Sequence, residues 1–341
     1  MFKHLRSPDF KRLTKALSGG QPDAVPLIEL GIHSKIKQSI MGKPVITIED
    51  EITFMSSMGY DFIKIQPHFQ LKSGIVDKQN TLQNGDRIWA SVHSGLIKKL
   101  DDVERFPWPK FEEISYARFE EAFKVLPDGI GVIGQYGDIF TLAWELMGFE
   151  SFAIASYEDP LIIKSLIDKI GSINLSMFET MASMDKVGAL WYSDDLAYSS
   201  GLLMSPSFYR EYLFPWVKKI GDLAKKRNIP FIYHSDGLLY PIIDDLIGCG
   251  VTSLHPIEPK AMALKEVKER YRHRLSICGN IELDTLCQGT QDEVRQLVFD
   301  ALRNGAPGGG FCLGSSNSIP DYVNPQNYLV MVETALENGW Y

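Results

Sequence analysis

The strongest chemical signal in the sequence is the segment His234-Ser235-Asp236-Gly237, which directly follows the apolar residues FIY. In an extended strand, side chains two residues apart point to the same side, so the imidazole of His234 and the carboxylate of Asp236 should lie on the same side of the chain. Such a pair can bind one metal ion, or the acid can orient the histidine for proton transfer. A histidine held by hydrogen bonds within a turn is the purely structural alternative.

A second signal is the glycine-rich stretch APGGGFCLGSSNSIP, which contains Cys312. Glycine permits backbone conformations and close approaches that other residues do not, so we expect Gly310 and Ser315 to contact a cofactor or another bulky ligand. With His234 and Asp236, Cys312 would complete a zinc site of three protein ligands that leaves one position open for substrate. A buried cysteine that only fills space is the alternative.

Paired carboxylates, Asp194 and Asp195, follow the run ALWYS. Alternation predicts that one points into a cavity and the other away from it. The inward one could act as a general acid, a metal ligand or an anchor for a cationic group, whereas its neighbour could hold a loop. Glu29 and Tyr136 are further catalytic candidates, and Asn280 is a candidate cofactor contact. Other candidates for lining the site are Gln135, His255 and Glu258, with Phe140, Trp144 and Trp191 as an apolar wall.

These residues follow short apolar runs that recur along the chain and alternate with segments of helical periodicity. About eight such runs occur, and they are AVPLIEL, DFIKIQP, GVIGQYG, ALWYSDD, PFIYHSDG, VTSLHPIE, LSICGNI and GGGFCLGSS. Alternating strands and helices imply a parallel sheet, and eight units predict an α/β fold of the (β/α)₈ TIM-barrel type. The loops after the strands would then gather the polar residues at one face of the barrel.

The intervening segments contain recognisable helix signals. Residues 206–228 place a row of apolar side chains on one helical face, at Tyr209, Leu213, Trp216, Val217, Ile220 and Leu223. Thr290 followed by Glu293 predicts a capping box, and Gly305 predicts a helix end.

Residues 71–128 interrupt this alternation of predicted strands and helices. They combine β-like pieces, an NGD turn signal and a proline-rich FPWPKF linker that leads into an amphipathic helix. We interpret them as an insertion after the second strand that covers one end of the barrel, although an excursion without any role at the site fits equally well. The sequence contains no internal repeat, so residues 1–341 are predicted to form one domain.

Composition excludes several classes of function. The chain has 341 residues, a formal net charge of −8 and 45% hydrophobic residues, and it contains no cluster of Lys and Arg that would neutralise a run of phosphates. Its four cysteines form no CxxC pair, which favours a reducing compartment, and the charged N-terminal segment lacks the apolar run of a signal peptide. We therefore expect a cytoplasmic protein that binds neither nucleic acid nor membranes.

Taken together, these motifs resemble the uroporphyrinogen decarboxylase superfamily, whose fold is a (β/α)₈ barrel. The resemblance covers most of the chain, and its most specific segments are YSDDLAYSSGLLMSPSFYREYLFPWVKKI and GGGFCLGSSNSIPDYVNPQNYLVMVETALENG. It implies one of two chemistries: decarboxylation of an acidic tetrapyrrole, or methyl transfer to or from a corrinoid (cobalamin-type) cofactor carried by a separate protein.

The first strand argues against the decarboxylase. The true decarboxylases carry an arginine-rich RQAGR-type signature after this strand. The resemblance implies that these arginines bind the carboxylates of the substrate. Here the segment reads LIELGIHSKIKQ and contains no arginine, so an acidic substrate would meet Glu29 where it needs a guanidinium.

The methyltransferase branch fits better, with one departure. Its members that act on coenzyme M bind zinc through an H-x-C pair and a distant cysteine, which His234 and Cys312 match, whereas Asp236 replaces the first cysteine. A carboxylate in place of a thiolate leaves the metal a stronger Lewis acid, which suits an ether oxygen. The resemblance thus implies demethylation of a small O-methyl donor, with zinc as cofactor, a corrinoid protein as partner, and Asp194 as an alternative direct proton donor.

Two rival functions stay open at this level. A decarboxylase or lyase acting on uroporphyrinogen or another small acid would use Asp194 or Asp195 as proton relay and would need no corrinoid. A non-catalytic corrinoid-binding or tetrapyrrole-binding protein would bind its ligand without turnover. The chain has no DxHxxG-type corrinoid-binding motif of its own, and its sequence is compatible with a homodimer.

Overall fold

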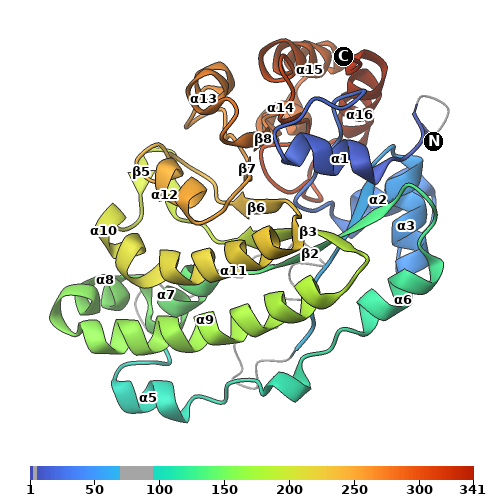
Figure 1. The fold of residues 1–341 in the computed structure, drawn as a ribbon. Coiled ribbons are helices and arrows are strands. Elements are labelled where there is room, and N and C mark those ends of the chain that lie inside the picture. The colour runs from blue at the N-terminus through green and yellow to red at the C-terminus, as the bar shows by residue number, and fades with distance from the viewer. Residues whose placement is uncertain (3–5, 70–94) are drawn as a thin grey trace.

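A curled sheet of seven parallel strands forms the centre of the protein, in the order β1-β2-β3-β6-β7-β8-β9. The computed structural model describes residues 1–2, 6–69 and 95–341, and Figure 1 shows the arrangement. Each strand pairs in parallel with its neighbours. The strands are β1 Phe62–Ile65, β2 Gly131–Gly137, β3 Val187–Ser193, β6 Phe231–His234, β7 Ser253–His255, β8 Ser276–Cys278 and β9 Phe311–Cys312, and a short antiparallel hairpin consists of β4 Ala197–Tyr198 and β5 Gly201–Leu202.

Seven of the eight predicted strands are therefore confirmed. The segment AVPLIEL, predicted as the first strand, makes isolated bridges instead, including a parallel one between Leu27 and Leu313 just beyond β9. Within the described residues no ladder joins this segment to β1. The fold is thus TIM-barrel-like, with seven strands in a half-barrel, and closure by an eighth strand stays a prediction.

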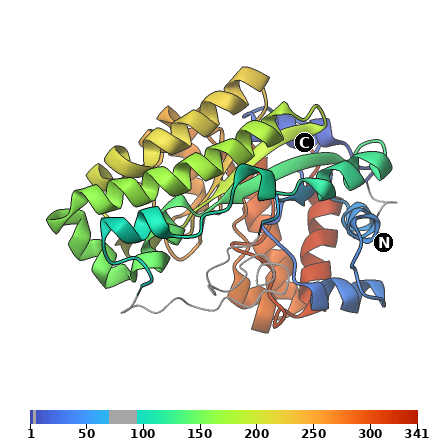
Figure 2. The same ribbon diagram turned by 90° about the horizontal axis from the view of Figure 1, so that it is seen from below.

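Helices follow the strands and cover the outer face of the sheet (Figures 1 and 2). The long helices α9 and α11 pack against each other on one side, and α15 packs against α16 at the far end of the sheet. The main helices are α1 Phe10–Leu17, α2 Ser34–Met41, α3 Ile48–Ser57, α7 Ile139–Met147, α8 Phe149–Glu158, α9 Pro160–Ser183, α11 Phe214–Arg227, α12 Ile243–Gly248, α13 Leu264–Tyr271, α14 Leu283–Gln288, α15 Gln291–Gly305 and α16 Pro325–Asn338.

Local sequence signals explain where several of these helices lie. Thr290 and Glu293 form the predicted capping box of α15, which ends at Gly305 as expected. The segment predicted as one helix over residues 206–228 begins as α10 Pro206–Phe208, passes through a π-helical turn at Tyr209–Leu213 and continues as α11. Its predicted apolar face is buried at Tyr209, Leu213, Val217 and Ile220.

The connection between β1 and β2 contains the predicted insertion. Most of its predicted β-like part, residues 71–94, lies outside the described residues. The described part contains α5 Leu100–Arg105, a 3₁₀ turn at Phe111–Glu113 and the expected amphipathic helix, α6 Ala117–Val125. Whether the insertion covers one end of the barrel stays a prediction.

No single helix among the described residues is long and apolar enough to cross a membrane. The consecutive helices α7 and α8 are long and apolar enough only when they are taken together, and they are bent by 98° relative to each other.

Candidate metal centre at the carboxyl ends of the strands

Three side chains converge where β3 and β6 end: Asp195, His234 and Asp236. One ligand atom from each lies within 4.8 Å of those of the other two, and in the described parts of the chain this is the one such group of His, Cys, Asp or Glu residues. The distance from His234 Nε2 to Asp195 Oδ1 is 3.7 Å. His234 is buried, whereas both carboxylates are half-buried. The cluster thus combines a fixed imidazole with two acids that a small ligand can reach.

Strand order explains why Asp195, and not Cys312, completes this group. Asp195 follows β3, which pairs directly with β6, whereas Cys312 lies on β9, three strands further along the sheet. At about 4.8 Å between neighbouring strands, that is a separation of roughly 14 Å along the sheet. The predicted ligand set of His234, Asp236 and Cys312 is therefore corrected to Asp195, His234 and Asp236.

Cys312 is fully buried beside a second thiol. Its partner in the ladder is Cys278. Burial, together with the neighbouring thiol of Cys278, raises the pKa of the Cys312 thiol far above its ordinary value. This environment matches the alternative interpretation of Cys312 as a buried space-filling residue.

Hydrogen bonds orient the two acids of the cluster. The backbone N–H of Asp236 donates to Asp195 Oδ1 at 3.1 Å, and Asn317 Nδ2 donates to Asp236 Oδ2 at 2.5 Å. Partners of this kind hold a ligating carboxylate in place and tune its basicity. Sequence analysis missed Asn317 because it lies 81 positions from Asp236, although it belongs to the same glycine-rich and serine-rich loop as Ser315.

The imidazole of His234 is oriented by a second histidine, His255, from the neighbouring strand β7. Their Nδ1 atoms lie 2.9 Å apart, which leaves His234 Nε2 directed towards the acids. The His255 ring lies 5.0 Å from the ring of Trp191, centroid to centroid. Burial lowers the pKa of His255 well below its ordinary value, and His234 and Lys64 add to the lowering. His255 is therefore neutral and positions His234 rather than carrying charge.

Asp194 points away from the cluster and holds the beginning of α7. Its Oδ2 accepts hydrogen bonds from Phe140 N at 2.7 Å and Tyr192 Oη at 2.7 Å, and its Oδ1 accepts from the amide and hydroxyl of Thr141 at 2.9 and 2.7 Å. Burial, with a contribution from Asp138, raises the pKa of Asp194 to about 7. The two adjacent aspartates thus point to different partners, as alternation predicted, with Asp195 as the one that faces His234.

Glu29 lies in the loop after the first predicted strand and is buried against Ser315. Its two carboxylate oxygens accept hydrogen bonds from the backbone N–H and the hydroxyl of Ser315, at 3.0 and 2.5 Å. Burial raises the pKa of Glu29 to about 8 in spite of these bonds and of the charge of Lys64. Ser315, predicted to contact a cofactor, therefore contacts Glu29 in this structure.

The raised pKa of Glu29 leads to a prediction about stability. Between about pH 5 and 8 the folded protein keeps a proton that the unfolded chain has released, so this carboxyl makes unfolding easier as the pH rises, by up to about 1.4 kcal/mol per pH unit. We expect the Glu29→Gln variant to lack this contribution. Urea unfolding at pH 5, 6 and 7 should give a flatter pH dependence for the variant than for the wild type, and parallel curves would contradict the prediction.

Two other predicted residues lie away from the cluster. Tyr136, at the end of β2, packs its ring 5.8 Å from that of Phe69, in an apolar pocket that Trp108 and Met177 also line. Gly310 precedes β9, so it lies at the amino ends of the strands, opposite the cluster. There it adopts φ of 62°, and its N–H donates to the carbonyl of Gly20. Its role in this structure is to let two chain segments approach each other closely.

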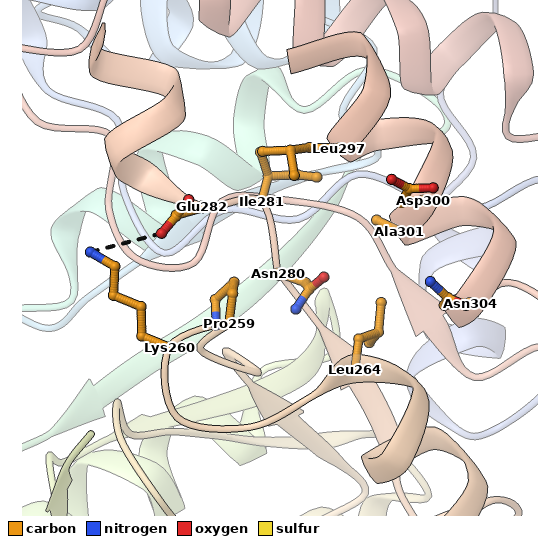
Figure 3. A pocket seen from close by; sticks show the side chains of 10 residues that line it. All are labelled: Pro259, Lys260, Leu264, Asn280, Ile281, Glu282, Leu297, Asp300, Ala301 and Asn304. Atoms are coloured by element: carbon orange, nitrogen blue, oxygen red, sulfur yellow. Dashed lines mark ion pairs between the residues drawn. The ribbon is translucent and has the colours of Figure 1, made fainter. Parts of the chain in front are cut away.

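Asn280 lines a separate cavity of about 190 Å³ between α13 and α15 (Figure 3). Its side chain donates to the carbonyl of Ile257 at 3.0 Å, and on the rim Lys260 lies 3.8 Å from Glu282. Figure 3 shows no residue of the metal cluster among those that line this cavity. Of the predicted cofactor contacts, Asn280 and Ser315 lie on neighbouring segments, since Ile281 forms a parallel bridge with Ser315, whereas Gly310 lies at the opposite ends of the strands.

The cluster has the donor set that a divalent metal needs. One imidazole and two carboxylates are ligands of zinc and of other divalent ions, and three protein ligands leave a position open for substrate. The residues present therefore fit a catalytic metal.

Comparisons with known proteins agree with this fold. The profile of the family described as uroporphyrinogen decarboxylase (URO-D) matches residues 85–337. A uroporphyrinogen decarboxylase of Citrifermentans bemidjiense is 28% identical over 155 residues, which span 43% of this chain and 44% of that protein. One of Pseudoalteromonas translucida is 23% identical over 71% of this chain and 69% of that protein. The chain thus spans less than half the length of the Citrifermentans bemidjiense protein.

Among solved structures, a methyltransferase from Methanosarcina mazei superposes with a TM-score of 0.69. The alignment covers 97% of this chain and 98% of that one at 20% identity, and it shows a shared fold.

Proposed function

Because the chain belongs to the uroporphyrinogen decarboxylase family, we propose that it is a methyltransferase of the corrinoid-dependent branch, which moves a methyl group from a small O-methyl donor to the cobalt of a corrinoid on a partner protein. The observation that carries this proposal is the cluster of Asp195, His234 and Asp236, which has the ligands for a Lewis-acidic metal at the end of the barrel where substrates enter such folds.

In this proposal Asp195, His234 and Asp236 would hold zinc or a related divalent ion. When bound, that ion supplies Lewis acidity, which makes the oxygen a better leaving group. The bond between the methyl carbon and oxygen would break with its electron pair left on the oxygen, and the reduced cobalt(I) of the partner's corrinoid would supply the pair for the new bond to carbon. His255 and Asn317 keep His234 and Asp236 in position.

The departing oxygen finally needs a proton. Glu29 is a candidate for this step because burial raises its pKa to about 8, so its carboxyl carries a proton at neutral pH. Tyr136 and Asp194 were the other candidates, but the carboxylate of Asp194 accepts four hydrogen bonds, whereas that of Glu29 accepts two, both from Ser315. We assign Glu29 the proton and Asp195 the metal.

Decarboxylation of an acidic substrate is the second candidate, because the curated relatives are named uroporphyrinogen decarboxylases. That substrate class needs several cations in the barrel. Among the described residues, the two buried arginines are engaged elsewhere: Arg12 pairs with Asp23 and Asp61, and Arg6 donates to the carbonyl of Val25. This distribution of charge favours methyl transfer.

Two assays distinguish these candidates. The purified protein, supplied with zinc and reduced cobalamin, is expected to give the absorption change of cobalt methylation with at least one of a panel of methoxylated compounds. A decarboxylase would instead release carbon dioxide from uroporphyrinogen without any corrinoid. Carbon dioxide release together with no cobalt methylation across the panel would overturn our proposal.

A further inference from the structure

The loop after β9 runs beside the segment that contains Glu29, and backbone contacts fix the register between the two. The N–H of Ile28 donates to the carbonyl of Leu313, and Leu27 forms a parallel bridge with the same residue. Ser315 therefore lies beside Glu29, and the exposed fractions of these two residues are 0% and 2%. Because both side chains are buried, their polar atoms need hydrogen-bond partners within the protein.

The hydroxyl of Ser315 contacts two oxygen atoms. It lies 2.5 Å from Glu29 Oε2 and within hydrogen-bond distance of the backbone carbonyl oxygen of Asn317. A serine hydroxyl has one proton and a carbonyl oxygen can only accept, so both contacts are hydrogen bonds at the same time only when Glu29 carries a proton. In that state the acid donates to Ser315 Oγ, and Ser315 donates to the carbonyl of Asn317.

Loss of the proton from Glu29 would redistribute these bonds. A carboxylate can only accept, so Glu29 and the carbonyl of Asn317 would then compete for the single proton of Ser315. A charged acceptor makes the stronger hydrogen bond, so the carbonyl of Asn317 would lose its donor. The contacts of Ser315 thus link the proton on Glu29 to the position of Asn317.

Asn317 in turn connects Ser315 with the metal cluster. Its Nδ2 donates to Asp236 Oδ2 at 2.5 Å, and its Oδ1 accepts a hydrogen bond from the N–H of Ser318 at 2.6 Å. With its backbone carbonyl bonded to Ser315, both the main chain and the side chain of Asn317 are held. Residues that hold a ligating carboxylate set its orientation and basicity. Ser315 and Asn317 therefore join the carboxyl group of Glu29 to Asp236.

The charged and titratable groups that face Glu29 are Lys64, Tyr60 and Tyr328. Burial raises the pKa of Glu29 to about 8, while the hydrogen bonds from Ser315 and the charge of Lys64 oppose this rise. Burial also raises the pKa values of both tyrosines well above their ordinary range, so these residues are neutral. The protonated arrangement is therefore the one expected at neutral pH.

We propose that Ser315 is a positioning residue that couples the protonation of Glu29 to the metal cluster. While Glu29 is protonated, Ser315 holds the carbonyl of Asn317, and Asn317 keeps Asp236 oriented for the metal. This inference rests on the proposed function only for the use that catalysis makes of the Glu29 proton.

Infrared spectroscopy of the metal-free protein tests the hydrogen bond of Glu29. At pH 6 the wild type should show the carbonyl band of a protonated carboxyl that Glu29→Gln lacks, whereas any band of Asp194, whose pKa is also raised, is common to both proteins. The frequency of the Glu29 band should change in Ser315→Ala, which removes its partner. It should stay unchanged in Ser316→Ala, the matched control at the next buried serine. Absence of the band from the wild type, or the same frequency in Ser315→Ala, would overturn the proposal.

Zinc titration calorimetry at pH 7 tests the coupling. Glu29→Gln should bind zinc about as tightly as the wild type, because its amide can donate to Ser315 Oγ as the protonated acid does. Ser315→Ala should lower the affinity by about ten-fold, as expected for loss of a residue that orients a metal ligand. Asn317→Ala should lower it at least as much. The double variant should be no weaker than Asn317→Ala alone, because Ser315 acts through Asn317.

The outcomes separate this proposal from the proposed function. Wild-type zinc affinity in Ser315→Ala, additive losses in the double variant, or a loss in Glu29→Gln as large as in Ser315→Ala would each overturn the coupling. The comparison of the wild type with Glu29→Gln does not depend on the folding of Ser315→Ala. Neither assay uses a corrinoid or a methyl donor, so failure of cobalt methylation would overturn the methyl transfer and leave the coupling in place. Absence of zinc binding by the wild type would overturn both.

Discussion

Replacement of His234 by alanine is expected to lower the affinity of the protein for zinc by at least about 100-fold and to abolish turnover. The cluster of Asp195, His234 and Asp236 has three ligands, and loss of the imidazole leaves two carboxylates that are half exposed to water. Even residues that only orient metal ligands contribute 10- to 100-fold in affinity, so loss of a ligand should cost more. Titration calorimetry with zinc, and metal analysis after dialysis, measure the effect.

The informative control for this experiment is Cys312→Ala. The resemblance made Cys312 a ligand, whereas strand order places it three strands from His234, so the structure predicts a metal content equal to that of the wild type. Asp195→Asn, which keeps the size of the side chain, should resemble His234→Ala. If Cys312→Ala lost the metal and Asp195→Asn kept it, the cluster identified here would not be the metal site.

The second large effect concerns stability. We expect Asp194→Ala to lower the free energy of unfolding by about 2 to 5 kcal/mol, because the buried amide of Phe140 and the partly buried amide of Thr141 would lose their acceptor, together with the hydroxyls of Thr141 and Tyr192. Asp194 supplies, from a distant part of the chain, the acceptors that a capping side chain normally provides at a helix terminus. Urea unfolding followed by circular dichroism measures the change.

The adjacent residue provides the matched control. Asp195→Ala removes a carboxylate from the same loop, but one that is half-buried beside Asp236, whose backbone N–H donates to it. In the metal-free protein it should change the free energy of unfolding by less than about 1 kcal/mol, while metal binding is lost. A destabilisation of Asp195→Ala as large as that of Asp194→Ala would contradict this division of roles.

The sequence by itself determined the secondary structure and the end of the sheet at which the chemistry lies. Apolar runs identified seven strands, the capping box identified the start of α15, and His234 with Asp236 was selected because alternation puts both on one side of the chain. These features depend on neighbours within a few residues, so they can be predicted from the amino-acid sequence.

The tertiary structure decided which distant side chains join that pair. Asp195, and not Cys312, joins the cluster because β3, and not β9, lies beside β6. Asn317 orients Asp236 through a hydrogen bond between residues 81 positions apart in the sequence. The contact of Lys64 with the Trp191 ring, at 4.9 Å from its centre, likewise joins residues that are far apart in the sequence. Local periodicity sets the direction of a side chain, whereas its partners are set by strand order, which no local pattern encodes.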